Sequence, residues 1–369
     1  MRERHCRLAR MPNDRIFKTE PLTRAIAAVI GAGGSDAREA RLVAENLVEA
    51  NLQGHDSHGI GMVPRYVAAL LEGGLHANRH VSVKLDAGAM LTLDGNAGYG
   101  QVVGKEAMEL AVPRAREHGS CVMVLGNAHH LGRIGHWAEM AVAEGLVAIH
   151  FVNVISHARV APYAGADARF GTNPVCVGIP LPGEAPFLLD MATSAVAQGK
   201  MRVAHNKGEK VADGLLIDDH GNPTNDPRYV VVPPWGALLS TGAYKGYGFS
   251  VVCELLGGAL SGGGTWHYED HTRMRVYNGM FTVLLDPARL GTRDAFERET
   301  RAYLDWLRRC PPAPGHDKVR IAGEPEREWK AKRIKDGIPV DDTTWDEIIA
   351  AGAKLKVQRE AIERLAAGT

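Results

Sequence analysis

Several kinds of residue are scarce in this chain, and each scarcity narrows what the protein can be. Its 369 residues include only five cysteines, which are scattered and form no Cys-x-x-Cys pair. That usage argues against a disulfide framework or a thiolate zinc site, and it suits a reducing cytoplasm. No hydrophobic run reaches the length needed to cross a bilayer. We therefore expect a cytoplasmic protein with no membrane partner.

Net charge is absent as well. Lys and Arg together number 43, as do Asp and Glu, so the formal net charge is +0. A balanced chain has no broad field of one sign that would attract nucleic acid. The basic N-terminus, MRERHCRLARMPNDRIF, lacks the apolar core of a secretory signal. We predict that residues 1–14 form a disordered extension, with Met11 as an alternative start of the chain.

The apolar pattern alternates between strands and helices. A chain of this length exceeds a single core, so two domains are expected. Apolar runs predict strands at 90–93, 121–125, 146–153, 174–179, 187–189 and 280–285, and helical periodicity predicts helices at 101–117, 132–144 and 247–260. Residues 86–289 are thus predicted to form an α/β domain. Residues 15–85 and 290–369 look more helical and are predicted to form one domain around it.

Two capping boxes predict where helices begin. Asp36 with Glu39 predicts the start of a helix that ends near Gly54. Thr344 with Glu347 predicts the start of the last helix. A tail helix before it is predicted to have one apolar face, formed by Phe296, Tyr303, Leu304 and Leu307.

The glycine pattern most similar to a dinucleotide-binding fingerprint is GYGQVVG, with Gly98, Gly100 and Gly104. It has one residue too many before its third glycine. The following strand ends at Gly126 and Asn127, where the fingerprint requires an acidic residue for the ribose. We therefore interpret these glycines as a tight strand-to-helix turn, and any nicotinamide cofactor must be bound in another way.

Four polar clusters have the residue types of an active site. Asp190 ends an apolar strand, a common position for functional groups in α/β folds, although it could equally cap the helix that follows. Lys245 lies between glycines at a helix start, where ammonium and free amides could meet phosphate, although a solvated surface lysine is the simpler interpretation. The other two clusters are Ser57 with His58 and His129 with His130.

The histidines raise two other chemistries. A metal-dependent hydrolase or lyase would use His55, His58 and His130, but the ligand spacings typical of zinc enzymes are missing from the sequence. Adjacent histidines in a strand point to opposite faces, so only one of His129 and His130 could serve such a site. A serine hydrolase would use Ser57, which does not lie in a G-x-S-x-G turn. We predict no metal site.

Six motifs occur together in one order: DSHGIGMVPRY, GNAHHLGRIGHWAEMA, SHARVAPYAGADARFGTNP, DMATSAVAQGK, YKGYGF and AGEPE. In this the chain resembles the type 2 malate/L-lactate dehydrogenase family over about residues 15–355, and it shares the wording GHDSHGIGM with the hydroxycarboxylate dehydrogenase B branch. The resemblance implies a homodimer that uses NAD or NADP. It also implies a largely antiparallel, non-Rossmann cofactor-binding sheet domain, inserted in a mainly helical substrate and dimerisation domain formed by both chain ends.

The resemblance also assigns roles to single residues. The matched catalytic residues are Ser57, His58, Asp190 and His130. The matched pocket residues are Thr172 and Asn173, and the matched cofactor contacts are His130, Gly132, Leu189, Asp190, Met191, Lys245, Gly323 and Glu324, with Ala322 in place of the usual proline. A histidine can protonate a carbonyl oxygen as hydride arrives, while a carboxylate fixes its tautomer. We favour His58 with Asp190 as the catalytic pair and keep His130 as the second candidate.

One position departs from the family. Many members have an arginine four residues after the motif histidine, where it can bind the substrate carboxylate, and this chain has Met62 there. An unpaired buried carboxylate is costly, so an acid substrate needs another cation. Arg65 and Arg159 are the candidates. The substitution could also admit a bulkier, more apolar substrate, since methionine is adaptable.

Together these features predict an NAD(P)-dependent oxidoreductase acting on a small molecule. It would interconvert a 2-oxo acid and its 2-hydroxy acid by hydride transfer with a His–Asp proton relay. One alternative is a cyclic imino acid (ketimine) reductase of the same family, because the same relay serves both reactions. The other is the metal-dependent hydrolase or lyase.

Overall fold

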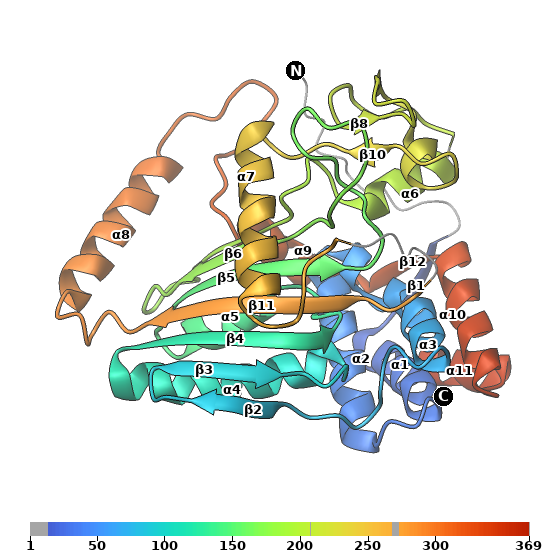
Figure 1. The fold of residues 1–369 in the computed structure, drawn as a ribbon, viewed down its shortest axis with the longest axis horizontal. Helices are drawn as coiled ribbons and strands as arrows, with labels where there is room; N and C mark the ends of the chain where they lie inside the picture. Colours follow the sequence, from blue (N-terminus) through green and yellow to red (C-terminus); the bar gives the residue numbers. More distant parts are fainter. Residues whose placement is uncertain (1–13, 207, 268–272, 369) are drawn as a thin grey trace.

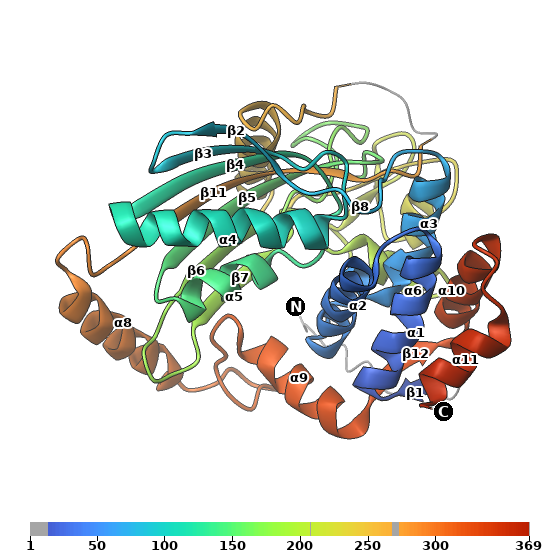
Figure 2. The same ribbon diagram turned by 90° about the horizontal axis from the view of Figure 1, so that it is seen from below.

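The computed structural model describes residues 14–206, 208–267 and 273–368, which form a helical part beside a large sheet (Figures 1 and 2). The predicted extension at 1–14 lies outside these residues except for Asp14, which begins strand β1 (Asp14–Phe17). No described helix is both long and apolar enough to span a membrane.

The helical part brings the two ends of the chain together. Strand β1 pairs antiparallel with β12 (Ile338–Asp341). A single apolar cluster contains buried residues from the range 22–102 and from the range 338–366. Its burial supplies much of the hydrophobic stabilisation of this part. The surrounding helices are α1 (Thr19–Ala32), α2 (Ala37–Leu52), α3 (Val63–Leu71), α10 (Asp342–Lys354) and α11 (Arg359–Ala367).

The large sheet has seven strands in the order β2-β3-β4-β11-β5-β6-β7. Only the β3–β4 pairing is parallel, so the prediction of a largely antiparallel sheet in an α/β fold is confirmed. The domain boundary predicted at 85/86 falls inside β2. The strands are β2 (Ser82–Asp86), β3 (Met90–Asp94), β4 (Ser120–His129), β5 (Val147–Ile155), β6 (Val175–Ile179), β7 (Phe187–Met191) and β11 (Tyr277–Leu285).

Helices cover both faces of this sheet. Helices α4 (Gly100–His118) and α5 (Gly135–Ala143) lie on one face, and α7 (Tyr244–Val252) stands on the other (Figures 1 and 2). The helix predicted at 247–260 begins three residues earlier than predicted, at Tyr244. From Cys253 to Ala259 it continues as a π-helix, η4. The backbone carbonyls of β5 and β11 approach Gly257 there so closely that a side chain would not fit.

Smaller elements complete the chain. A short sheet of β8 (Leu216–Ile217), β9 (Pro223–Thr224) and β10 (Ala237–Leu238) lies with α6 (Gln198–Asn206) and η3 (Pro227–Val230). Helix α8 (Arg293–Arg308) projects from the side of the molecule, and α9 (Glu324–Asp336) returns to α2 (Figure 2). On α8, Leu304 and Leu307 pack inward, but Tyr303 is 62% exposed, so the predicted four-residue apolar face is wrong at that position.

Of the two predicted helix caps, the first is confirmed and the second is wrong. Asp36 caps α2, because its carboxylate accepts a hydrogen bond from the Glu39 amide at 2.7 Å. The second box is wrong, because the cap of α10 is Asp341, whose carboxylate accepts from the Thr344 amide at 2.8 Å. Helix α11 follows α10, so α10 is not the last helix. An aspartate before the first turn caps a helix as a threonine does, and here the helix begins three residues earlier than the predicted box.

Candidate active site

The segment that carries Ser57 and His58 is a 3-10 turn, η1 (Asp56–His58), between α2 and α3. Asp56 anchors it by accepting hydrogen bonds from Asn51 Nδ2 at 2.6 Å and from both terminal nitrogens of Arg333 at 2.7 and 3.0 Å. Arg333 is itself buried. Because a bidentate, charge-assisted contact restricts geometry, this anchor fixes the turn and the direction of His58.

His58 lies against His130. Nδ1 of His58 and Nε2 of His130 are 3.3 Å apart, and the two rings stack with an interplanar angle of 14°. His130 directly follows β4, so the pair joins the helical part to the sheet. The structure thus brings both candidate acid/base histidines into one site.

Two further residues, which the sequence did not single out, extend this contact. The Tyr66 hydroxyl lies 2.7 Å from Nδ1 of His130, and Nε2 of Gln101 donates to the same hydroxyl at 2.7 Å. Gly100 makes this possible, because a Cβ there would collide with the His130 carbonyl. The glycine turn GYGQVVG therefore allows close packing, in addition to the turn from strand to helix that its spacing predicted.

The pair is uncharged by virtue of its surroundings. Burial, together with the charge of His55, holds the pKa of His58 below its ordinary value, and the charge of Asp190 partly offsets this. Burial, followed by the neighbouring His58, His129 and Arg65, holds the pKa of His130 well below its ordinary value. Both imidazoles are therefore neutral near pH 7.

Asp190 lies at the end of β7, near this pair but not hydrogen-bonded to it in the described part of the chain. One carboxylate oxygen accepts from the Gly135 amide at 2.7 Å. Asp190 thereby caps α5, not the helix that follows it in sequence. Its charge acts on His58 through space, since it raises the pKa of that histidine.

Two half-buried arginines lie near each other, and the charge of one of them, Arg65, acts on His130. Arg65 donates from Nε to the Met274 carbonyl at 2.9 Å and from Nη2 to the Ser156 hydroxyl at 2.8 Å. Burial and then the charge of Arg65 lower the pKa of Arg159 to about 10. Arg159 also stacks over the Trp235 ring at 4.8 Å. The two cations that the sequence proposed for a carboxylate thus lie within electrostatic reach of each other.

The other predicted substrate residues take different positions. Ser57 is exposed, and its Cβ lies against Gly199 at the start of α6. The Thr172 carbonyl accepts from the Thr193 amide at 3.0 Å. The Asn173 side chain is fully enclosed, where it accepts from the Val154 amide and donates to Glu254. Ser57 is thus accessible, whereas the Asn173 amide is engaged in joining β5 to η4.

Met62, where many relatives would have an arginine, packs partly against the apolar cluster of the helical part. His129 is also internal: its side chain is fully buried, and its Nε2 accepts from the Val276 amide at 3.3 Å. Only His130 of the adjacent histidines therefore faces the site, as the alternation of a strand predicts.

Four of the predicted cofactor contacts lie together, and the others lie elsewhere. Leu189 and Met191 lie on edge strand β7, where the neighbouring Leu188 amide donates to the Ala322 carbonyl at 3.2 Å and so brings Gly323 and Glu324 to the same edge. Gly132 has a φ of 72°, and a Cβ there would lie 2.8 Å from the Asn46 amide oxygen. Lys245 is exposed in the first turn of α7.

Of the three histidines of the metal hypothesis, His58 and His130 are in contact, but His55 has a different partner. His55 pairs with Glu326, with 3.4 Å between its Nε2 and the carboxylate. Across residues 14–206, 208–267 and 273–368, no group of three or more His, Cys, Asp or Glu side chains is arranged to hold a metal ion.

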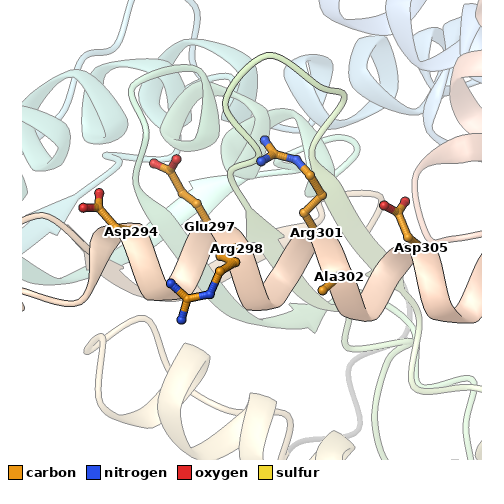
Figure 3. Close-up of a pocket in the computed structure, with 6 residues that line it drawn as sticks. All are labelled: Asp294, Glu297, Arg298, Arg301, Ala302 and Asp305. Carbon is orange, nitrogen blue, oxygen red and sulfur yellow. The ribbon is translucent and has the colours of Figure 1, made fainter.

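A surface hollow of about 430 Å³ lies along α8 and is unrelated to the histidine pair. Figure 3 shows that its lining residues all project from this one helix. They are Asp294, Glu297, Arg298, Arg301, Ala302 and Asp305. Because its lining is almost entirely charged and belongs to one helix, it lacks the enclosed, largely apolar character of a small-molecule site.

Comparison with known proteins agrees with this geometry. The chain is 43% identical to hydroxycarboxylate dehydrogenase B of Escherichia coli (strain K12) over 352 residues, which are 94% of this chain and 96% of that protein. It is 41% identical to L-lactate dehydrogenase of Cupriavidus necator over 85% of this chain and 90% of that one. A solved structure of a putative malate/lactate dehydrogenase from E. coli superposes with a TM-score of 0.92 at 42% identity, covering 96% of this chain and 99% of that chain. The sequence profile of the malate/L-lactate dehydrogenase family matches residues 17–349, and the chain belongs to this family of oxidoreductases.

Proposed function

We propose that the protein is an NAD(P)-dependent dehydrogenase that interconverts a small 2-oxo acid and the corresponding 2-hydroxy acid. The observation that carries this proposal is the contact of His58 with His130 at 3.3 Å, beside the charge of Arg65, which has Arg159 within electrostatic reach. It places a proton-transfer group next to cations that can bind a carboxylate. A 2-hydroxy acid carries a carboxylate and a hydroxyl on neighbouring carbons, so it suits both.

Each residue has a distinct task in this proposal. When a 2-oxo acid is reduced, His58 in its imidazolium form gives a proton to the oxygen on C2 and becomes neutral, and oxidation of the 2-hydroxy acid reverses this transfer. The charge of Asp190 favours the imidazolium. Arg65 and Arg159 bind the carboxylate and orient the reacting carbon. The exposed Ser57 hydroxyl, next to His58 in the chain, orients the substrate oxygen. The names of the E. coli and Cupriavidus relatives, both dehydrogenases of hydroxy acids, support this class of substrate.

The chain has groups that fit a pyridine nucleotide, and we assign the binding of this nucleotide to the predicted domain 86–289. The buried Nη1 of Arg133 has no hydrogen-bond partner among the described residues, and it lies beside Gly135 at the start of α5. An unpartnered guanidinium nitrogen at a helix N-terminus suits a phosphate or ribose oxygen. The backbone of Gly132 and the ammonium of Lys245 are the other proposed contacts. When bound, the nicotinamide supplies hydride to C2 or accepts it.

A substrate screen tests the proposed function. The purified protein should oxidise NADH or NADPH with at least one small 2-oxo acid, followed by absorbance, and it should keep its full rate after treatment with a chelator. Loss of activity on chelation that zinc restores would favour the metal-dependent hydrolase or lyase instead. Turnover of cyclic imino acids without turnover of any 2-oxo acid would favour the ketimine reductase.

Lys245 provides a test of the cofactor assignment. Lys245→Ala should weaken NAD(P)H binding roughly ten-fold in a fluorescence titration and leave the thermal stability unchanged, because it removes a hydrogen bond from a charged donor and no core volume. Lys354→Ala, which removes an exposed lysine from α10, is the matched control and should have no effect. Equal affinities for wild type and Lys245→Ala would reduce Lys245 to a surface lysine.

A further inference from the structure

We propose that Tyr66 and Gln101 are positioning residues that fix the tautomer of His130 and thereby make His58 the histidine that meets the substrate. The inference rests on the proposed dehydrogenase function, because it chooses between the two acid/base candidates of that reaction. It stands on four side chains in contact: Gln101, Tyr66, His130 and His58.

The direction of each hydrogen bond follows from the donor at the far end. Nε2 of Gln101 is an amide N–H, so the Tyr66 oxygen accepts there at 2.7 Å. The hydroxyl hydrogen is then directed to Nδ1 of His130 at 2.7 Å, which must accept it. A neutral imidazole that accepts at one nitrogen carries its proton on the other. Nε2 of His130 therefore donates to Nδ1 of His58 at 3.3 Å.

The surroundings maintain these directions of donation and acceptance. Tyr66 is fully buried, and burial raises the pKa of its hydroxyl, so the hydroxyl remains a donor. Gln101 is also buried, 1% exposed, so the far end of the chain of hydrogen bonds is closed to water. The series of hydrogen bonds ends at the side-chain amide of Gln101, which does not ionise. Tyr66 and Gln101 therefore orient His130 and deliver no proton themselves.

Backbone packing places Gln101 where it can do this. Gly100, at the first position of α4, lies so close to the His130 carbonyl that any side chain there would collide with it. The first turn of α4 is thus pressed against the segment that follows β4. Tyr66 reaches the same point from α3, and its ring packs edge-on to that of Tyr99 with centroids 5.9 Å apart. Three elements therefore fix the imidazole of His130.

The consequence is a division of roles between the two histidines. Both ring nitrogens of His130 are engaged, one by Tyr66 and one by His58. Nε2 of His58 has no hydrogen-bond partner within the residues that the structure describes, and it is the nitrogen left to face a substrate. In this order of protons it carries a hydrogen and presents a donor to the carbonyl oxygen of a 2-oxo acid.

Nuclear magnetic resonance tests the inference without turnover. In protein with ¹⁵N-labelled histidine, two-bond proton–nitrogen correlations show which ring nitrogen carries the proton, and single histidine substitutions assign the signals. We expect His130 protonated on Nε2 in the wild type and a mixture of tautomers in Tyr66→Phe. That variant should also lose about ten-fold in kcat, with a smaller change in KM, the size expected for one orienting hydrogen bond.

Tyr99→Phe is the matched control, because Tyr99 is equally buried and touches Tyr66 but lies outside the hydrogen-bonded chain. It should leave the His130 tautomer unchanged, and Gln101→Leu should shift it as Tyr66→Phe does. A proton on Nδ1 of His130 in the wild type, or an unchanged tautomer in Tyr66→Phe, would overturn the inference. The two proposals can fail separately. If the tautomers are as expected but the protein reduces no 2-oxo acid, the role of Tyr66 and Gln101 stands and only the dehydrogenase assignment is refuted.

Discussion

His58→Ala should lower kcat roughly 10²–10⁴-fold, the range typical of general acid–base catalysis, while the protein keeps its fold. The imidazole is half-buried, and its turn is held by Asp56 and Arg333, so removing the ring leaves the anchor of the turn intact. Steady-state kinetics with NAD(P)H and the preferred 2-oxo acid measure this loss. His80→Ala, which removes an exposed histidine, is the control and should keep full activity.

Asp190 should act on the same step through its charge. Asp190→Asn keeps an oxygen that can accept from the Gly135 amide, so it preserves the cap of α5 and removes only the charge. Since that charge raises the pKa of His58, the variant should reduce its substrate more slowly and with a pH optimum moved to lower pH. A double variant with His58→Ala should lose little more than His58→Ala alone, because residues acting as one unit are not additive.

The opposite pattern would assign the proton to the second histidine. His130→Ala should raise KM and disturb the position of His58, with a smaller loss in kcat than His58→Ala causes. If kcat collapsed in His130→Ala and barely moved in His58→Ala, then His130 would be the acid/base. Ser57 and His58 would then be substrate-positioning residues.

Removing either Arg65 or Arg159 should have the second large effect, a rise in KM. Arg159→Ala and Arg65→Ala should each raise KM for a 2-oxo acid about 10–100-fold, because hydrogen bonds to charged groups contribute about 1.5–3 kcal/mol. kcat should change less, since the carboxylate is bound in the ground state and the transition state alike. Initial rates over a range of substrate concentrations separate the two constants.

A matched substrate makes this test specific. The methyl ester of the same 2-oxo acid lacks the carboxylate charge, so wild type and both variants should handle it equally poorly. Arg169→Ala is the control variant, because Arg169 is exposed and pairs with Asp167. Unchanged KM values in Arg65→Ala and Arg159→Ala would contradict the assignment and leave the carboxylate to other donors.

Local patterns predicted those parts of the fold that depend on local forces. Helix α4 was predicted at 101–117 and spans Gly100–His118, because its apolar periodicity and the glycine turn before it are contained in one segment. The pairing of β1 with β12 had no such signal. It joins residues more than three hundred positions apart, and each strand is only four residues long. Such contacts are decided by packing of the whole chain.

The candidate site shows the same limit. Ser57, His58 and His130 could be named from their motifs, because each motif concentrates polar groups in a few residues. No pattern in the sequence connects Tyr66 with Gln101, since an amide and a tyrosine near apolar neighbours look like ordinary buried polar residues. Their role depends on three elements meeting in space. Asp190 was assigned two alternative roles, and the structure shows it capping a helix that precedes it in sequence.

The position of β11 determines when this site can be completed during synthesis. This strand lies between β4 and β5, although both leave the ribosome long before it does. Until then the two older strands have open, facing edges, which favour misassociation with other chains. Asn278 on β11 also accepts a hydrogen bond from the Leu131 amide at 2.8 Å, directly after His130. The nascent chain therefore completes the backbone contacts next to His130 only after its central strand has emerged.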